Sequence, residues 1–385
     1  MAIKDSQTQI ITQALATPAP PVVVPPVAGI IGSLKLIEYS NPSAPTVAAN
    51  VTGVVATPGG DECMWFDARH RAYTLSSTLA PNKLQITDCS SRTAPVVLSS
   101  INTALAGAGF NRMTVSGDGL GFFLIIARAN IGASANVLEV FNVSDPTAPA
   151  SVQSYNIASD FATSQANPSG AISRGNLLVV SSVENLFTDG KLGFYNLAAL
   201  PVITQTTVTN LVPGATMDLA FDLVDVDVTA TLAYVLVISD SLGIKELRIY
   251  DISTPALLVL LGSVALPQPG GAGTLVTILS NVDNGKIYGI SSSSLNTDLY
   301  VIDVTNPLAP AVVSNTPVTT NSNFSVRGND DTCFLARRAN AGVPNNRTLT
   351  LFDTSNPLIP VEQGSVIYNA AGAASQLHLD VGFGV

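Results

Sequence analysis

The stretch LYVIDVTNPLAPAVV, residues 299–313, has a close counterpart 50 residues later in LTLFDTSNPLIPVEQ, residues 349–363. Both begin with alternating apolar residues, a pattern typical of a β-strand with one buried face. Both then reach an aspartate and an Asn-Pro pair, and proline cannot donate the hydrogen bond that would continue a strand ladder. We therefore expect a strand, a tight corner and a second strand in each copy.

The same pattern occurs seven times, at spacings of 50 to 55 residues. The copies begin at Leu34, Leu84, Leu138, Leu192, Leu247, Leu299 and Leu349. Each apolar stretch ends in a side chain that can accept hydrogen bonds from backbone amides just ahead of it. These residues are Glu38, Asp88, Asn142, Asn196, Asp251, Asp303 and Asp353. Some copies depart from the pattern: the second has Arg92 in place of the first proline, the fourth is shorter, and the fifth lacks the second proline.

Two further strand-like runs lie between successive copies and are joined by tight turns. SGDGLG, residues 116–121, and Asn284-Gly285 are examples of turn sequences that join antiparallel strands. Four short strands in about 50 residues make the unit of a β-propeller blade. A parallel β-helix has shorter coils, and immunoglobulin-like repeats are about 100 residues long. The sequence predicts an all-β, seven-bladed propeller of four-stranded antiparallel blades.

The repeat resembles the LVIVD repeat of bacterial, archaeal and phage propeller proteins, whose unit reads approximately L-x-V-x-D-V-S-N-P-x-x-P. The resemblance covers about residues 34–383. It implies the propeller fold and frequent cell-surface or extracellular placement. It carries no activity and no catalytic residues to this chain.

The end of the chain, QLHLDVGFG at residues 376–384, is similar to the first strand of a blade. The blade that begins at Leu34 has no such strand ahead of it. We expect Gln376 to Phe383 to supply the inner strand of that blade, so that the C-terminal strand joins the N-terminal blade and closes the ring. Closure removes the open sheet edges at which β-proteins associate wrongly.

Residues 1–29 lie outside the repeat, and residues 30–385 form the predicted propeller. Prolines make the first segment an extended, polyproline-like arm that has too few core residues to fold alone. They are Pro18, Pro20, Pro21, Pro25 and Pro26. This segment has no basic stretch followed by a continuous apolar run, so it does not predict a secretory signal. Terminal segments of this kind are commonly frayed tails; the favoured interpretation is that this arm docks on a neighbouring subunit.

Charged residues make up only 11% of the chain, and the formal net charge is -10. Nucleic-acid binding requires clustered Lys and Arg, which the sequence lacks, so no nucleic-acid partner is expected. No apolar run reaches the ~18 residues of a membrane-spanning helix, so no membrane insertion is expected. A neutral, polar surface favours an assembled protein over a freely diffusing enzyme.

Candidate chemical residues are few. His70 falls in a predicted turn between inner strands, and His378 falls in the closing strand. Cys63, Cys89 and Cys333 are too scattered for a disulfide framework or a zinc site, and are expected to be small buried hydrophobes. No catalytic motif and no phosphate-binding glycine loop is present. The sequence therefore predicts no enzyme, no catalytic residue and no cofactor.

An acidic cluster in MDLAFDLVDVDVTA contains Asp218, Asp222, Asp225 and Asp227. Strand alternation would place Asp225 and Asp227 on one face, where paired carboxylates can bind calcium or serve a glycosidase. The favoured interpretation is that they form the solvated side of a hairpin, so they are weak candidates for a metal site.

Three functional classes remain open from the sequence. The preferred one is a structural, protein-interacting propeller of a phage virion (tail, neck, spike or capsid-decorating protein), part of a symmetric assembly and docked through its arm. The alternative is a secreted or cell-surface prokaryotic propeller that acts as an adhesin or glycan-binding module. An enzyme or lectin with a site on one propeller face is the third. A host-surface receptor or glycan is a possible further partner.

Overall fold

The computed structural model describes most of the chain in short consecutive ranges. These are residues 27–30, 34–51, 64–67, 69–75, 83–103, 111–115, 123–128, 137–157, 160–161, 167–183, 190–211, 220–227, 229–239, 244–267, 276–292, 297–318, 325–329, 331–338, 347–369 and 378–381. All regular elements within these ranges are β-strands. The described part of the chain has no helix of the length and apolarity needed to cross a membrane.

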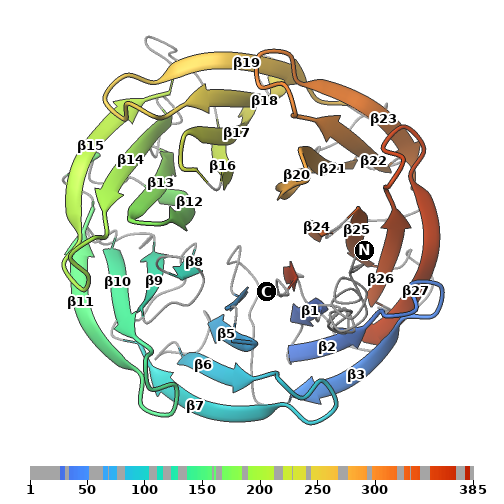
Figure 1. Ribbon diagram of the computed structural model, residues 1–385, viewed down its shortest axis with the longest axis horizontal. Helices are drawn as coiled ribbons and strands as arrows, with labels where there is room; N and C mark the ends of the chain where they lie inside the picture. The colour runs from blue at the N-terminus through green and yellow to red at the C-terminus, as the bar shows by residue number, and fades with distance from the viewer. Residues whose placement is uncertain are drawn as a thin grey trace, which may run out of the picture.

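The strands are arranged as four-stranded antiparallel sheets around a common centre, so the predicted all-β propeller is confirmed (Figure 1). Hydrogen bonding defines seven such sheets among the described residues, which we call blades 1 to 7. The strands of each blade are given from the innermost to the outermost. Blade 1 contains β28 (His378–Val381), β1 (Val27–Ile30), β2 (Leu34–Glu38) and β3 (Thr46–Val51). Blade 2 contains β4 (Met64–Phe66), β5 (Arg71–Leu75), β6 (Lys83–Asp88) and β7 (Val96–Asn102). Blade 3 contains β8 (Asn111–Val115), β9 (Phe123–Arg128), β10 (Val137–Asn142) and β11 (Ala150–Asn156).

Blade 4 contains β12 (Asn167–Arg174), β13 (Leu177–Val183), β14 (Gly190–Asn196) and β15 (Thr204–Asn210). Blade 5 contains β16 (Ala220–Val226), β17 (Leu232–Ser239), β18 (Ile244–Asp251) and β19 (Val259–Ala265). Blade 6 contains β20 (Val276–Asp283), β21 (Lys286–Ser292), β22 (Thr297–Asp303) and β23 (Ala311–Pro317). Blade 7 contains β24 (Ser325–Asn329), β25 (Thr332–Arg338), β26 (Arg347–Asp353) and β27 (Val361–Asn369). The third and fourth strands of each blade contain the repeated sequence and its corner.

Blade 1 combines the two ends of the described chain. Strand β28 pairs antiparallel with β1, with His378 opposite Ile30 and Val381 opposite Val27. The propeller therefore begins at Val27 and not at residue 30, because residues assigned by sequence to the arm form a strand of blade 1. The arm prolines Pro18, Pro20, Pro21, Pro25 and Pro26 lie outside the described residues.

The corners are closed by the side chains that the repeat predicts. In every copy the residue that ends the third strand accepts a hydrogen bond from the backbone N–H two residues ahead, at 2.8–3.0 Å. The acceptors are Glu38, Asp88, Asn142, Asn196, Asp251, Asp303 and Asp353. The repeated acidic or amide residue is thus a turn-forming group and belongs to the scaffold.

Corners also contact the blade before them, and in Figure 1 their loops overlie the preceding outer strands. A Cβ built at Gly262 of β19 would lie 2.6 Å from the carbonyl oxygen of Pro307 in the corner of blade 6. A Cβ at Gly364 of β27 would lie 2.4 Å from the carbonyl oxygen of Pro42 in the corner of blade 1. Thr209 of β15 donates its hydroxyl to the carbonyl oxygen of Pro255 at 2.8 Å. The contact between blades 7 and 1 is therefore of the same kind as the contact between blades 5 and 6.

Two departures from the repeat pair with each other. Arg92, which replaces a proline in the corner of blade 2, places its Nη1 2.5 Å from Oε2 of Glu38 in blade 1. Glu38 is itself the one glutamate at a position where the other copies have Asp or Asn. Partial burial acts to raise the pKa of Glu38, but the bond from Arg92 and those from Ser40 outweigh it and lower the pKa. The longer side chain of Glu38 thus reaches the guanidinium of Arg92 across the joint between blades 1 and 2.

Every outer strand carries an irregularity at the same place. The register between the third and fourth strands shifts by one residue just after the second apolar position of the repeat. The shifts follow Leu36, Ile86, Val140, Phe194, Ile249, Val301 and Leu351. A bulge twists an edge strand and interrupts its row of free backbone groups, which protects the rim against edge-to-edge pairing.

The core consists of apolar side chains between neighbouring blades. At the joint of blades 7 and 1, Ile37 and Tyr39 pack with Phe334, Leu349 and Leu351. The rings of Tyr39 and Phe334 meet edge to face at 4.9 Å between centroids. Each such side chain stabilises the fold by about 1.5–3 kcal/mol when fully buried. The apolar residues of the repeat therefore pack between neighbouring blades.

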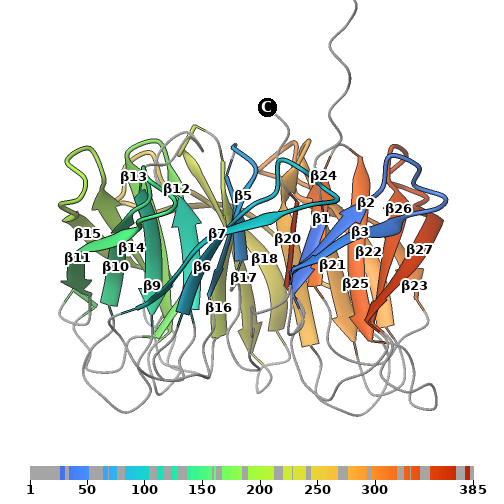
Figure 2. The same ribbon diagram turned by 90° about the horizontal axis from the view of Figure 1, so that it is seen from below.

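The Asn284-Gly285 turn between β20 and β21 is confirmed. Both residues have positive φ, 47° and 72°, as a two-residue type I′ hairpin turn requires. The predicted turn at SGDGLG lies outside the described residues. Antiparallel pairing within the blades places the described corners, and first hairpin turns such as Asn284-Gly285, at one end of the disc, here called the corner face, which is the upper end in Figure 2.

Candidate functional site

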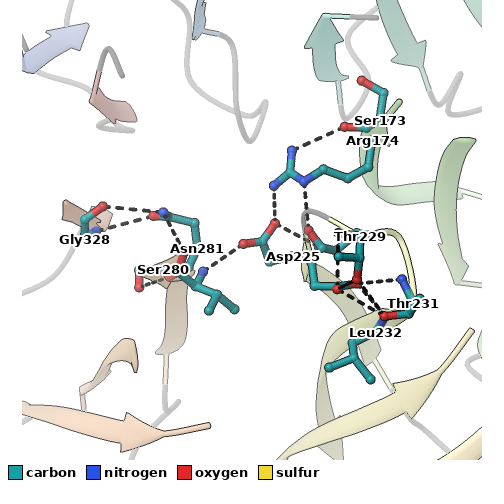
Figure 3. Close-up of polar contacts among 12 residues, drawn as sticks. Ser173, Arg174, Asp225, Thr229, Thr231, Leu232, Ser280, Asn281 and Gly328 are labelled. Carbon is teal, nitrogen blue, oxygen red and sulfur yellow. Dashed lines mark hydrogen bonds and ion pairs between the residues drawn. The ribbon is translucent and has the colours of Figure 1, made fainter. Parts of the chain in front are cut away.

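Polar groups join the inner strands of four consecutive blades near the centre of the ring (Figure 3). Arg174 at the end of β12 bonds to Asp225 of β16, and Asp225 bonds to the backbone of Val282 in β20. Asn281 of β20 then bonds to the backbone of Gly328 in β24. We name this set the inner ladder: Arg174, Asp225, Asn281, Val282 and Gly328.

Asp225 is the central member of the inner ladder and is only 5% exposed. Its Oδ1 accepts from Arg174 Nη2 at 2.7 Å and from the N–H of Val226 at 2.8 Å. Its Oδ2 accepts from the N–H of Val282 at 2.8 Å. Burial raises the pKa of Asp225, against the opposing effects of Arg174, the two backbone amides and the charge of Arg327. One carboxylate therefore connects blades 4, 5 and 6.

Arg174 holds both the carboxylate and the backbone of blade 5. Its Nε donates to the carbonyl oxygen of Val226 at 2.9 Å, beside the 2.7 Å bond from Nη2 to Asp225. Two parallel bonds from one planar guanidinium fix its orientation as well as its position. Asn281 makes a similar paired contact, because its side-chain amide both donates to and accepts from the backbone of Gly328, each at 3.4 Å.

Asp227 has a different role from Asp225. It lies after the end of β16, and its Oδ1 accepts from the N–H groups of Thr231 at 2.7 Å and Leu232 at 2.6 Å. Partial burial acts to raise the pKa of Asp227, but donors from Thr229, Leu232 and Thr231 outweigh it and hold the pKa below its ordinary value. Asp227 thus closes the hairpin turn between β16 and β17.

The structure corrects the sequence expectation for this pair. Asp225 and Asp227 do not share a strand face, because the strand ends at Val226 and its register shifts between Leu223 and Asp225. Asp225 is also not on a solvated side of the hairpin, since it is buried against Arg174. Within the described ranges, no group of three or more His, Cys, Asp or Glu side chains could hold a metal ion. Asp218 lies outside the described residues.

The inner ladder was not found from the sequence, because its members are far apart in it. Arg174 and Asp225 are separated by 51 residues, and Asp225 and Val282 by 57. These separations are close to one repeat, which places the residues at similar levels in successive blades. An alignment of the inner strands of the copies would have carried that signal.

The histidines and cysteines that the sequence offers as candidates for chemistry occupy the following positions in the fold. His70 has a positive φ of 59° in the turn between β4 and β5, as expected from the sequence. His378 is the first residue of β28. Cys89 and Cys333 are buried and free, and burial raises the pKa of both thiols, to about 12 for Cys89. Cys63 lies outside the described residues.

The corners provide a second candidate site, on the rim. Directly after the corner proline, or one residue later, blades 5 to 7 carry large apolar side chains that are 62–67% exposed. We name this set the apolar arc: Leu257, Leu308, Leu358 and Ile359. Blades 1 to 3 have Ser or Thr followed by Ala at the same positions: Ser43-Ala44, Thr93-Ala94 and Thr147-Ala148. The scaffold is repeated, but its outer surface differs between the two halves of the ring.

The apolar arc continues onto the neighbouring strands. Val259 and Leu260 of β19 are 45% and 49% exposed, and the corner that carries Leu308 packs against Gly262 of the same strand. Val361 follows the corner of blade 7 and is 54% exposed. Large exposed apolar patches are uncommon on monomeric proteins and mark sites of association.

No protein-family model matches the chain, and no curated protein matches its sequence. Solved structures with the same fold do match. The chain is similar to a periplasmic gluconolactonase of Pseudomonas aeruginosa, with a TM-score of 0.61 and 13% identity over 92% of this chain and 99% of that one. It is also similar to a protein from Lactobacillus plantarum, with a TM-score of 0.60 and 11% identity over 92% and 99% of the two chains.

A third similar structure is a hypothetical selenium-binding protein from Sulfolobus tokodaii. Its TM-score is 0.55 at 10% identity, over 78% of this chain and 74% of that one. At these identities the comparisons show the propeller fold and carry no activity to this chain.

The expectation that the chain is not an enzyme is corrected by these comparisons. The protein from Pseudomonas aeruginosa, which shares nearly its whole length with this fold, is named a gluconolactonase. A propeller of this size and architecture is therefore compatible with catalysis, and lack of a familiar sequence motif does not make the chain non-catalytic. Fold and function are assigned separately.

Proposed function

We propose that this chain is a protein-interaction propeller that serves as a structural component of a phage virion. In this proposal its partners are other protein subunits of a symmetric assembly, and it docks on them through its N-terminal arm. The observation that carries the proposal is the apolar arc, because three consecutive blades expose Leu or Ile where three others expose Ser, Thr and Ala. Among the described corners, large apolar side chains follow the proline in three blades and small side chains follow it in three others, which favours a specific protein contact on one part of the rim.

The inner ladder supports this function by making the scaffold rigid. Its charged groups satisfy one another: Asp225 accepts bonds from blades 4, 5 and 6, and Arg174 is bonded at both Nε and Nη2. A carboxylate with three donors is poorly available as a metal ligand or a general base. The ladder therefore fits a role in holding blades together beneath a binding rim.

Two further parts of the proposal concern the architecture. The seven sheets form one closed ring, in which the C-terminal strand β28 completes blade 1 beside β1. The chain is a member of the LVIVD-repeat propellers, supported by the Asx-Pro corner sequences at Asn306-Pro307 and Asn356-Pro357. Both parts fit a rigid building block that presents its rim to neighbours.

Location in the virion is the part of the proposal that an experiment can test directly. An antiserum raised against the folded propeller should label purified phage particles from the source organism in immuno-electron microscopy. Label confined to the cell surface would contradict the virion role and support the alternative, a surface propeller that binds a receptor or glycan. Serum from the same animal before immunisation is the control.

A further inference from the structure

The apolar arc favours a partner surface that is apolar and carries no charge. Its four side chains are uncharged and highly exposed, and exposed apolar groups gain most from contact with other apolar groups. A charged segment would have to lose its hydration there without a counter-ion. These properties favour an uncharged, apolar stretch of polypeptide as the occupant.

The chain itself contains such a stretch outside the propeller. Residues 6–34 include no Asp, Glu, Lys or Arg, and the segment ahead of β1 carries Ile10, Ile11 and Leu15. Prolines in residues 18–26 lack backbone donors and favour an extended chain, so these apolar residues cannot readily build a core of their own. The arm and the arc are thus complementary in chemistry.

The place where the arm joins the propeller brings it to the correct face. Val27, the first residue of β1, lies opposite Ile37, directly before the corner of blade 1. Strand β1 therefore begins at the corner face, the same face that carries the corners of Leu308 and Leu358, whose side chains are exposed. Residues 1–26 precede this point, and an extended chain of ~3.1 Å per residue can reach about 80 Å.

The start of β1 and the prolines that precede it in the sequence favour a second copy over the same chain. Strand β1 begins at the corner face and runs away from it, so the chain enters blade 1 at that face. Pro25 and Pro26 stand directly before Val27 and favour a straight continuation over a turn back to the rim. Because the arm root and the arc share one face, a two-fold axis between facing discs lets two copies exchange arms reciprocally.

We infer that the apolar arc of blades 5 to 7 is the receptor for the N-terminal arm of a second copy of this chain, in a reciprocal two-fold dimer. The inference rests on the proposed function, because it names the subunit on which the arm docks. Ile10, Ile11 and Leu15 contact the corners that carry Leu308, Leu358 and Ile359.

Sedimentation equilibrium of the full chain tests the inference. One variant carries Leu308→Ser, Leu358→Ser and Ile359→Ser, which gives these corners the small side chains typical of blades 1 to 3. A second carries Ile10→Ser, Ile11→Ser and Leu15→Ser in the arm. The wild-type chain should be a dimer, and each variant should weaken the dimer at least about tenfold. Val96→Ser removes an exposed apolar group, 56% exposed, outside the arc and should change nothing.

Each result has a definite meaning. A wild-type chain that is monomeric at all concentrations overturns the dimer, whereas the virion role stands or falls on the antiserum. An arm variant that weakens association while the arc variant does not overturns the arc as receptor and leaves docking through the arm intact. An arc variant that acts alone overturns the arm as occupant. Unchanged melting temperatures of both variants show that the altered surface residues leave the fold intact.

Discussion

Alanine at position 364 would place a methyl group where the chain has no room for one. Its Cβ would lie 2.4 Å from the carbonyl oxygen of Pro42, 2.9 Å from the carbonyl carbon of Ser43 and 3.0 Å from Cδ of Pro45. These are backbone and proline atoms of the blade 1 corner, which cannot move aside as a flexible side chain could. Overpacking of this kind costs about 1–3 kcal/mol.

The expected change in melting temperature follows from the size of the chain. With an unfolding entropy of ~2.1 cal/mol/K per residue, 385 residues give about 0.8 kcal/mol/K. Gly364→Ala should therefore lower the melting temperature by about 1–4 °C in differential scanning calorimetry. The variant therefore reports on the packing between β27 of blade 7 and the corner of blade 1.

Two variants at the same position of other outer strands are matched controls. Gly262→Ala affects the joint between blades 5 and 6, where the Cβ would lie 2.6 Å from the carbonyl oxygen of Pro307, and should destabilise similarly. Ser314 of β23 already has a Cβ there, and its buried hydroxyl has no hydrogen-bond partner, so Ser314→Ala should be neutral or slightly stabilising. If Gly262→Ala lowers the melting temperature and Gly364→Ala does not, the joint between blades 7 and 1 is not packed as described.

The inner ladder gives two further predictions. Arg174→Ala should destabilise the fold by about 3 kcal/mol in urea titrations, because it leaves the buried carboxylate of Asp225 without its cation. Adding Asp225→Asn to this variant should recover most of the lost stability. Equal losses of stability in the single and double variants would contradict this pairing. Burial raises the pKa of Asp225 above its ordinary value of 3.8, so the native state binds this proton more readily than the unfolded state. Stability should therefore fall as pH rises from about 4 through the raised pKa. The melting-temperature difference between wild type and Asp225→Asn should depend on pH in this range, and a constant difference would refute the sign.

The repeated elements were predictable from the sequence because they recur. Seven spaced copies with an Asx-Pro corner predict the strand, the turn and the second strand, and the bonds made by residues such as Asp303 and Asp353 confirm the corner. The Asn284-Gly285 turn was predictable for the same local reason, since its backbone requires two positive φ angles.

The bulges within blades and the contacts between blades were not predictable in this way. The bulge after Val301 leaves the alternating pattern of apolar residues unchanged, so periodicity alone cannot reveal it. Arg174 and Asp225 come together only when two blades are placed side by side, and an acidic cluster in sequence gave the wrong expectation of a solvated face. Arg92 and Glu38 were visible as separate exceptions, and the structure shows them as one ion pair.

Cross-linking at the corner of blade 6 tests the docking surface most directly. A photo-crosslinking side chain in place of Leu308, in an equal mixture of isotopically light and heavy full-length chains, should yield mixed light–heavy products with peptides that contain Ile10 to Leu15. The same side chain in place of Ser43, at the matched corner position of blade 1, should yield few such products. Cross-links to the arm within single chains only, or equal yields at both corners, would contradict the binding of a second copy's arm to the apolar arc.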